Sequence, residues 1–167
     1  MASRKENKMN YQYNDGGRSK YFKAKGVGDC AIRAIAIATR QDYLAVYDAL
    51  KALNGGNSCR NGTPKLVDKK YLTDYGATKV NMNPPAGRGR WHVTTIDKVM
   101  KNYPDIRYIL QVSKHLIAGQ GDTIFDLFDD RPRDKGIYIM WLINATEEEA
   151  KAIQTQVSLG TARRFEL

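Results

Sequence analysis

The stretch that most constrains this chain is "GVGDCAIRAIAIAT", residues 26–39, where one of only two cysteines opens an apolar segment. Apolar residues recur there at helical spacing, so we expect a short buried helix over residues 30–39. A helix N-terminus stabilises a thiolate through its unpaired amides and dipole. Cys30 is therefore the candidate nucleophile, with the amides of Asp29 and Cys30 as oxyanion donors. The alternative is that Cys30 packs behind the helix, because cysteine is among the most buried residue types.

A histidine and an acid to serve this thiol are expected in "VSKHLIAGQGDTIFDLFDD", residues 112–130. If Gln120-Gly121 forms a tight turn between two strands, residues whose numbers sum to 241 face each other, and His115 faces Asp126. Cβ atoms of directly opposed residues lie about 4.5–5.5 Å apart, within reach of a hydrogen bond from carboxylate to imidazole. The alternative is a half-exposed histidine with an acid nearby by chance. Rival acids are Asp122, Asp129 and Asp130.

The remaining cysteine and histidine do not form a second constellation. His92 is a competing base, but no acid lies at a spacing that would orient it. Cys59 lies in the loop "NGGNSCRNG" and is predicted to be a bystander thiol. Two cysteines and two histidines match neither a disulfide framework nor zinc-ligand spacing, so we expect no metal and no organic cofactor.

The order of predicted elements favours the α+β class, with helices first and an antiparallel sheet after them. Asp42 is expected to cap a second helix that stops at Asn54. A last helix over about residues 146–159 is expected to open with a Thr146/Glu149 capping box and to close at Gly160. The other predicted elements are helices at 66–77 and 94–104, a strand of unusual length at 106–118, and strands at 122–129 and 136–144.

Length and charge suggest one domain with a basic extension. A chain of 167 residues supports a single core, which we place at residues 10–167 behind a flexible basic arm at 1–9. The net charge of +9 would permit a nucleic-acid partner, and a solvated basic surface is the simpler interpretation. No apolar run approaches the ~20 residues of a membrane span, and the N-terminus is polar, so a cytoplasmic protein without membrane contact is expected.

A helix-borne Cys in "GDCAIRAIA", then "SKHLIA" on a strand and an Asp on the next strand, in that chain order, resemble the papain-like cysteine peptidase superfamily. In that superfamily a helical part holds the Cys and a sheet holds the His and acid. More narrowly, small and mostly uncharacterised papain-like proteins of phages and mobile elements are similar to four segments: "YNDGGR" (13–18), "GDCAIRAIAIAT", "YLTDYG" (71–76) and "VSKHLIA" with "DTIFDLFD". The Cys segment also resembles that of the OTU deubiquitinases. The resemblance covers about residues 11–143.

The oxyanion donor departs from both patterns. Papain members carry a glutamine six positions before the Cys, where this chain has Ala24, and the OTU pattern Asp-Gly-Asn is replaced by residues 27–29, "VGD". Side-chain help would then come from Asn14 or Gln12. We expect Arg33, one helical turn after Cys30, to anchor an acidic residue.

The resemblance and the residues together predict a thiol hydrolase, a cysteine peptidase or isopeptidase with a Cys30-His115-Asp126 triad acting on a protein or peptide, such as a host protein of a phage. Two alternatives stay open. The thiol could pass its acyl group to an amine, as a transglutaminase-type transferase does. The domain could also be a non-catalytic interaction module, such as a phage inhibitor of a host protein or a nucleic-acid-associated protein. The oligomeric state is not predicted.

Overall fold

The computed structural model describes residues 9–23, 28–82, 89–129 and 136–162, and for residues 89–94 and 161–162 it describes the backbone alone. At its centre lies a six-stranded sheet in the order β1-β5-β4-β3-β6-β2. Strand β1 pairs parallel with β5, and the other pairs are antiparallel. The strands are β1 (Asn10–Tyr13), β2 (Thr78–Asn81), β3 (Arg107–Val112), β4 (His115–Gln120), β5 (Thr123–Asp126) and β6 (Ile137–Leu142).

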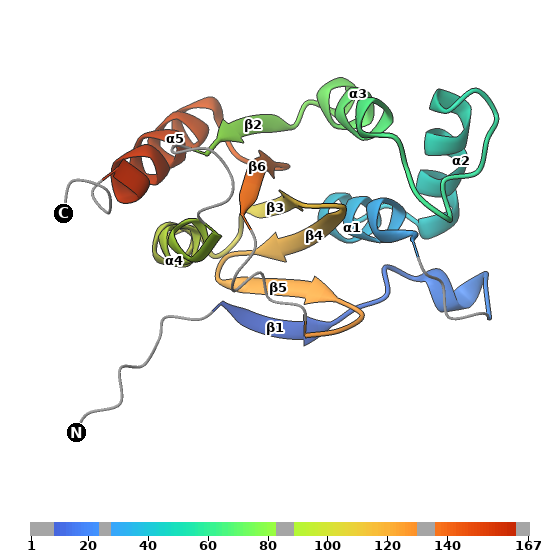
Figure 1. The fold of residues 1–167 in the computed structure, drawn as a ribbon, viewed down its shortest axis with the longest axis horizontal. Coiled ribbons are helices and arrows are strands. Elements are labelled where there is room, and N and C mark those ends of the chain that lie inside the picture. Colours follow the sequence, from blue (N-terminus) through green and yellow to red (C-terminus); the bar gives the residue numbers. More distant parts are fainter. Residues whose placement is uncertain (1–8, 24–27, 83–88, 130–135, 163–167) are drawn as a thin grey trace.

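Helices cover both faces of the sheet (Figure 1). Helix α1 packs on β3, β4 and β5, and α2 and α3 follow beside it; α4 and α5 pack on each other and against β6 and β2. Besides a 3-10 turn at Arg18–Lys20, the helices are α1 (Cys30–Thr39), α2 (Tyr43–Leu53), α3 (Lys65–Tyr75), α4 (Gly89–Met100) and α5 (Glu147–Ala162). The α+β class is therefore confirmed, with the sheet between two helical layers.

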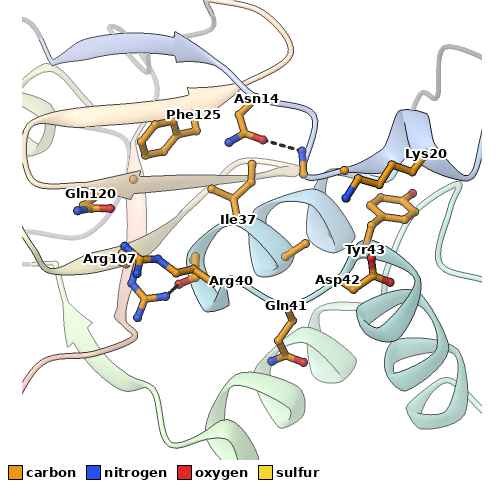
Figure 2. Close-up of a pocket in the computed structure, with 15 residues that line it drawn as sticks. Asn14, Lys20, Ile37, Arg40, Gln41, Asp42, Tyr43, Arg107, Gln120 and Phe125 are labelled. Atoms are coloured by element: carbon orange, nitrogen blue, oxygen red, sulfur yellow. Dashed lines mark hydrogen bonds between the residues drawn. The ribbon is translucent and has the colours of Figure 1, made fainter.

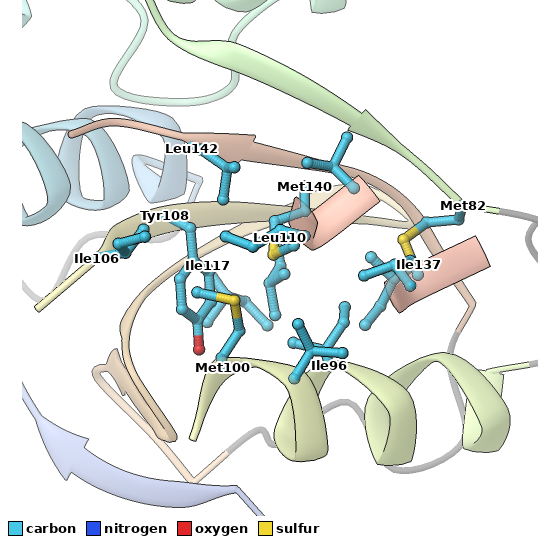
Figure 3. Close-up of a cluster of buried hydrophobic side chains, with 14 of the residues drawn as sticks. Met82, Ile96, Met100, Ile106, Tyr108, Leu110, Ile117, Ile137, Met140 and Leu142 are labelled. Atoms are coloured by element: carbon cyan, nitrogen blue, oxygen red, sulfur yellow. The ribbon is translucent and has the colours of Figure 1, made fainter. Parts of the chain in front are cut away.

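Two hydrophobic cores lie on opposite faces of the sheet because side chains alternate along a strand. On β3, Tyr108 and Leu110 belong to the core under α4 and α5, whereas Ile109 belongs to the core under α1. Figure 3 shows the first core, in which Ile96 and Met100 of α4 meet the sheet. The second core places α1 directly over the strands that carry His115 and Asp126.

The predicted long strand at 106–118 is wrong, because the chain turns back inside it. Ser113 and Lys114 form a two-residue turn between β3 and β4, with Val112 opposite His115. Lys114 adopts a φ of 56°, a left-handed conformation that side chains seldom take. The turn makes His115 the first residue of a strand rather than a residue in the middle of one.

The prediction that all strands pair antiparallel is also wrong for one strand pair, β1 and β5. Strand β1, "NYQY", lies at the edge, parallel to β5, and it was not predicted because it lacks an apolar alternation. Met9, placed in the flexible arm by the sequence, is 1% exposed and belongs to the core. The rest of the arm, residues 1–8, lies outside the described residues.

The sequence signals for the start of α2 and the start of α5 are confirmed, and the predicted end of α5 is corrected. Asp42 caps α2 by accepting from the amides of Leu44 and Ala45. The Thr146/Glu149 capping box is present in both directions, at 2.9 and 3.1 Å. Helix α5 runs past Gly160, which was predicted to end it; a Cβ at this glycine would lie 2.6 Å from Thr95 of α4, so the residue permits close helix packing instead.

Candidate active site

The three predicted catalytic residues come from three element ends that meet beside α1. Cys30 is the first residue of α1, His115 the first of β4, and Asp126 the last of β5. Cys30 is half-buried, the His115 side chain is 20% exposed and that of Asp126 5%. Nε2 of His115 lies 2.6 Å from Oδ2 of Asp126. The predicted histidine and acid are therefore in direct contact.

The contact arises from a different strand register than predicted. The turn is Gly121-Asp122, with Gly121 at a φ of 56°, and Gln120 pairs with Thr123. Asp126 is therefore diagonal to His115 rather than directly opposite. Shifting the turn by one residue moves the register by two, which keeps every side chain on its original face. The His115–Asp126 contact survives for that reason.

His115 is held from both sides. Burial of the ring lowers its pKa, but hydrogen bonding to Asp126 and to Cys30, together with their charges, outweighs burial and raises the pKa of His115 to about 9. Because Nε2 faces Asp126, Nδ1 is the ring nitrogen left to face Cys30. Thiol, imidazole and carboxylate thus form one interacting series, in which the protonated ring is favoured at neutral pH.

Asp126 is fixed as an ionised carboxylate. Burial raises its pKa, but His115, the Arg33 guanidinium and the Leu127 amide together hold the pKa below its usual range. Oδ1 accepts from Arg33 at 2.7 Å and from the Leu127 amide at 2.8 Å, which leaves Oδ2 for His115. The carbonyl oxygen of Asp126 accepts from the Asn14 amide, so the loop after β1 also fixes this residue.

Arg33 joins the acid to the start of the cysteine helix, as its spacing predicted. Its Nε donates to Asp29 at 2.8 Å while its Nη1 donates to Asp126. Asp29 also accepts from the Tyr43 hydroxyl at 2.7 Å, and Arg18 Nε lies 3.1 Å from its carboxylate in an ion pair that lacks hydrogen-bond geometry. All of these side chains are buried. Sequence reasoning missed Arg18 and Tyr43, which lie far from Asp29 along the chain.

The engagement of Asp29 leaves the helix start uncapped. Its carboxylate makes no hydrogen bond to the first amides of α1. The first amides of an α-helix have no partner within the helix, and among the described residues Asp29 does not cap them. The predicted role of the Asp29 and Cys30 amides as oxyanion donors stays a prediction. The two side-chain helpers are placed elsewhere: Asn14 Oδ1 accepts from the Gly16 amide, and Gln12 is exposed on the edge strand β1. Neither lines the cleft beside Cys30.

The cleft beside the thiol has a volume of about 380 Å³. It lies between the start of α1, the loop before α3 and the β3–β4 turn. Its lining residues are Gly28, Cys30, Ala31, Asn61, Gly62, Thr63, Lys65, Asp68, Gln111, Val112, Lys114, His115 and Leu116. The thiol and the imidazole therefore open onto the same depression of the surface.

The rival residues are placed outside this arrangement or outside the described chain. Cys59 is 0% exposed in the core beneath α1, as a bystander thiol would be. Asp122 lies in the β4–β5 turn, and Asp129 is exposed beyond the end of β5. His92 falls on α4 where the side chain is not described, and Asp130 lies outside the described residues.

Two oxygen atoms in the cleft wall lack hydrogen-bond partners among the described residues. They are Thr63 Oγ1 and Asp68 Oδ1, both without exposed surface. Burial raises the pKa of Asp68 to about 7. No sequence signal pointed to this carboxyl, since it belongs to an ordinary polar stretch of α3.

The raised pKa of Asp68 predicts a pH-dependent stability gain in Asp68→Asn. An unfolded Asp ionises near pH 4 and the folded one near 7, so the charge penalty grows between these values and is complete above pH 7. We expect the variant to be about 1–2 kcal/mol more stable at pH 8 and equal to wild type near pH 4, with partial exposure limiting the gain. Urea denaturation at both pH values measures this. The matched control Asp74→Asn, exposed on the same helix, should change stability by less than about 0.5 kcal/mol; an equal effect in both variants would contradict the assignment.

Across the described ranges, no three His, Cys, Asp or Glu side chains gather as they would around a metal ion. Within the same part of the chain, no helix combines the length and apolar character needed to cross a bilayer. Comparisons with family models, curated proteins and solved structures found nothing that matches this chain.

Proposed function

We propose that this protein is a thiol hydrolase of the cysteine peptidase or isopeptidase type, with Cys30 as nucleophile. The observation that carries the proposal is the His115 ring, 2.6 Å from Asp126 on one side and interacting with the Cys30 thiol on the other. An imidazolium next to a thiol at a helix N-terminus is the environment that favours the reactive thiolate. Nucleophile, base and orienting acid are then arranged as covalent acyl-group transfer requires.

The steps follow from the positions of these groups. Sγ of Cys30 attacks the carbonyl carbon of the substrate and forms an S–C bond, while the carbonyl oxygen takes the negative charge and faces the amides at the start of α1. His115, which holds the thiol proton, protonates the leaving amine as the C–N bond breaks. Water then attacks the thioester carbonyl as His115 accepts a proton from it, the C–S bond breaks, the carboxylic acid leaves, and the proton on His115 restores the starting state of the Cys30–His115 pair. Asp126, fixed by Arg33, orients the ring in both halves.

The fold is compatible with the papain-like superfamily suggested by the sequence. A helix that carries the Cys packs on antiparallel strands that carry the His and Asp, in the same chain order. We therefore infer membership of this superfamily as part of the proposal. Its substrate class is a protein or peptide, reached in the cytoplasm and, for a phage-encoded chain, in that of the host.

The proposal is tested by exposing a protein lysate to wild type and to Cys30→Ala. New peptide ends found by mass spectrometry with wild type alone would support a hydrolase. New isopeptide cross-links with wild type alone would show that an amine, rather than water, accepts the acyl group, which is the transferase alternative. Identical lysates after both treatments, at pH 6 to 9, would leave the non-catalytic interaction module as the better account.

We predict that activity declines as the pH rises through about 9. His115 must carry a proton to release the leaving amine, and its pKa is raised to about 9, so the protonated fraction falls about tenfold per pH unit above that value. The measurement is kcat/KM against pH on any substrate that the lysate reveals. If kcat/KM instead fell with rising pH at a midpoint between pH 6 and 7, Asp126 would not be stabilising the protonated ring of His115.

A further inference from the structure

A second cavity, of about 420 Å³, lies at the opposite end of α1 from the thiol (Figure 2). A helix of ten residues separates the two ends by about 15 Å. The cavity is bounded by the loop after β1, the last turn of α1, the start of α2 and strands β3 to β5. Nothing in the proposed hydrolysis uses it.

Positive charge gathers on this cavity. Arg40, Arg107 and Lys20 line it, and Asp42 is the single acid in the lining. Asp42 is already engaged: it accepts from the Tyr21 hydroxyl at 2.7 Å and from two amides at the start of α2. The charge of Lys20 also acts on Asp42. No carboxylate of the lining is therefore left to balance the two arginines.

The guanidinium groups of Arg40 and Arg107 lie side by side in Figure 2, and the pKa of Arg107 reflects its burial and the nearby charge of Arg40. Burial and the charge of Arg40 lower the pKa of Arg107. Nη1 of Arg107 donates to the Ala38 carbonyl at 2.6 Å, but Nε is buried and has no hydrogen-bond partner among the described residues. A buried donor left unpaired is costly, and so is an uncompensated pair of like charges.

An oxyanion in the cavity would balance the two like charges. Arginine presents a planar fork of donors that matches phosphate oxygens, and two adjacent forks carry the charge that a dianion neutralises and a monocarboxylate does not. The side-chain amide of Asn14 also lines the cavity. Its Oδ1 accepts from the backbone amide of Gly16, so its NH2 group points away from Gly16. Phe125, half-buried in the wall, offers an apolar surface beyond the charged end.

We propose that the cavity at the Arg40–Arg107 pair binds the phosphate group of a small phosphorylated molecule. The volume of about 420 Å³ has room for an organic group attached to the phosphate as well as for the free ion. The site is independent of the thiol hydrolase, because neither arginine contacts the cysteine, histidine or acid of that centre in the described contacts.

Isothermal titration calorimetry with inorganic phosphate, AMP and acetate, at constant ionic strength, tests the proposal. We expect phosphate or AMP to bind and acetate to bind at least about tenfold more weakly, since charge-assisted hydrogen bonds to two arginines are lost with a single negative charge. Tighter binding of AMP would identify a phosphate ester as the ligand, and tighter binding of phosphate the free ion. No heat with either at 10 mM would overturn the proposal.

Variants locate the binding. Arg107→Gln and Arg40→Gln should each weaken phosphate or AMP binding by about tenfold or more, whereas Lys69→Gln, an exposed cation on α3, should not. Arg107→Gln loses the hydrogen bond to the Ala38 carbonyl, which can disturb α1. Arg40 is exposed, so Arg40→Gln tests the site in a protein that retains the fold. Unchanged affinity in Arg40→Gln and Arg107→Gln, or equal loss in Lys69→Gln, would show that the anion binds elsewhere.

Discussion

Iodoacetamide at pH 7 is expected to alkylate Cys30 at least about 100-fold faster than Cys59 in the folded protein. Cys30 opens onto the cleft beside His115, whereas Cys59 is 0% exposed in the core beneath α1. A thiolate reacts and a thiol does not, and His115 with Asp126 provides the cationic neighbour that favours the thiolate. Peptide mapping by mass spectrometry over a time course gives both rates in one sample, so Cys59 acts as the internal control.

The same measurement on His115→Ala separates reactivity from exposure. Removing the ring takes away the imidazolium, so the Cys30 rate should fall by about 100-fold, within the range attributed to a positioned proton-transfer group. The rate at Cys59 should stay the same, which shows that the variant is folded. Fast labelling of Cys30 that does not respond to this substitution would mean that the thiol is simply exposed.

Arg33→Met should destabilise the fold by about 3 kcal/mol. The substitution leaves the buried carboxylates of Asp29 and Asp126 without their shared cation, and breaking a buried ion pair on one side costs about 3–5 kcal/mol. We place the cost at the lower end because Tyr43 and His115 still bond to these carboxylates. Urea denaturation at pH 7 gives the change in the free energy of unfolding.

An exposed ion pair supplies the matched control for Arg33. Lys70 lies 2.9 Å from Asp74 with both side chains more than half exposed, at 61% and 59%. Lys70→Met should change stability by less than about 0.5 kcal/mol, as exposed helical pairs do. A loss below about 1 kcal/mol in Arg33→Met would contradict a structural role for the Arg33 bridge.

Local signals along the chain predicted the helices that position the site. The start of α1 at Cys30 and the Asp42 cap of α2 depend on residues within one turn, and the structure has both. Strands β1 and β2 were missed because each is four residues long and lies at a sheet edge, where pairing with a distant strand decides the conformation. The Ser113-Lys114 turn was missed because serine is the one residue of the pair that favours turns, and Lys114 takes a left-handed φ that side chains seldom adopt.

The site was partly predictable for a similar reason. His115 and Asp126 are separated by a short hairpin, so their shared face follows from alternation even with the turn misplaced by one residue. The double contact of Arg33 was predictable only as an anchor for some acid, because Asp29 is four residues away but Asp126 is distant in sequence. The cleft carboxyl Asp68 and the Arg40–Arg107 pair depend on packing between elements, which no spacing along the chain reveals.

The most direct test of a coupled Cys30, His115 and Asp126 is an NMR titration of the His115 imidazole. The chain has two histidines, so a His92→Gln variant assigns the resonances. We predict that His115 titrates near pH 9, and that both Cys30→Ala and Asp126→Asn lower its pKa toward the usual value of about 6.5. A His115 pKa near 6.5 in wild type, unchanged by either substitution, would contradict the proposed arrangement.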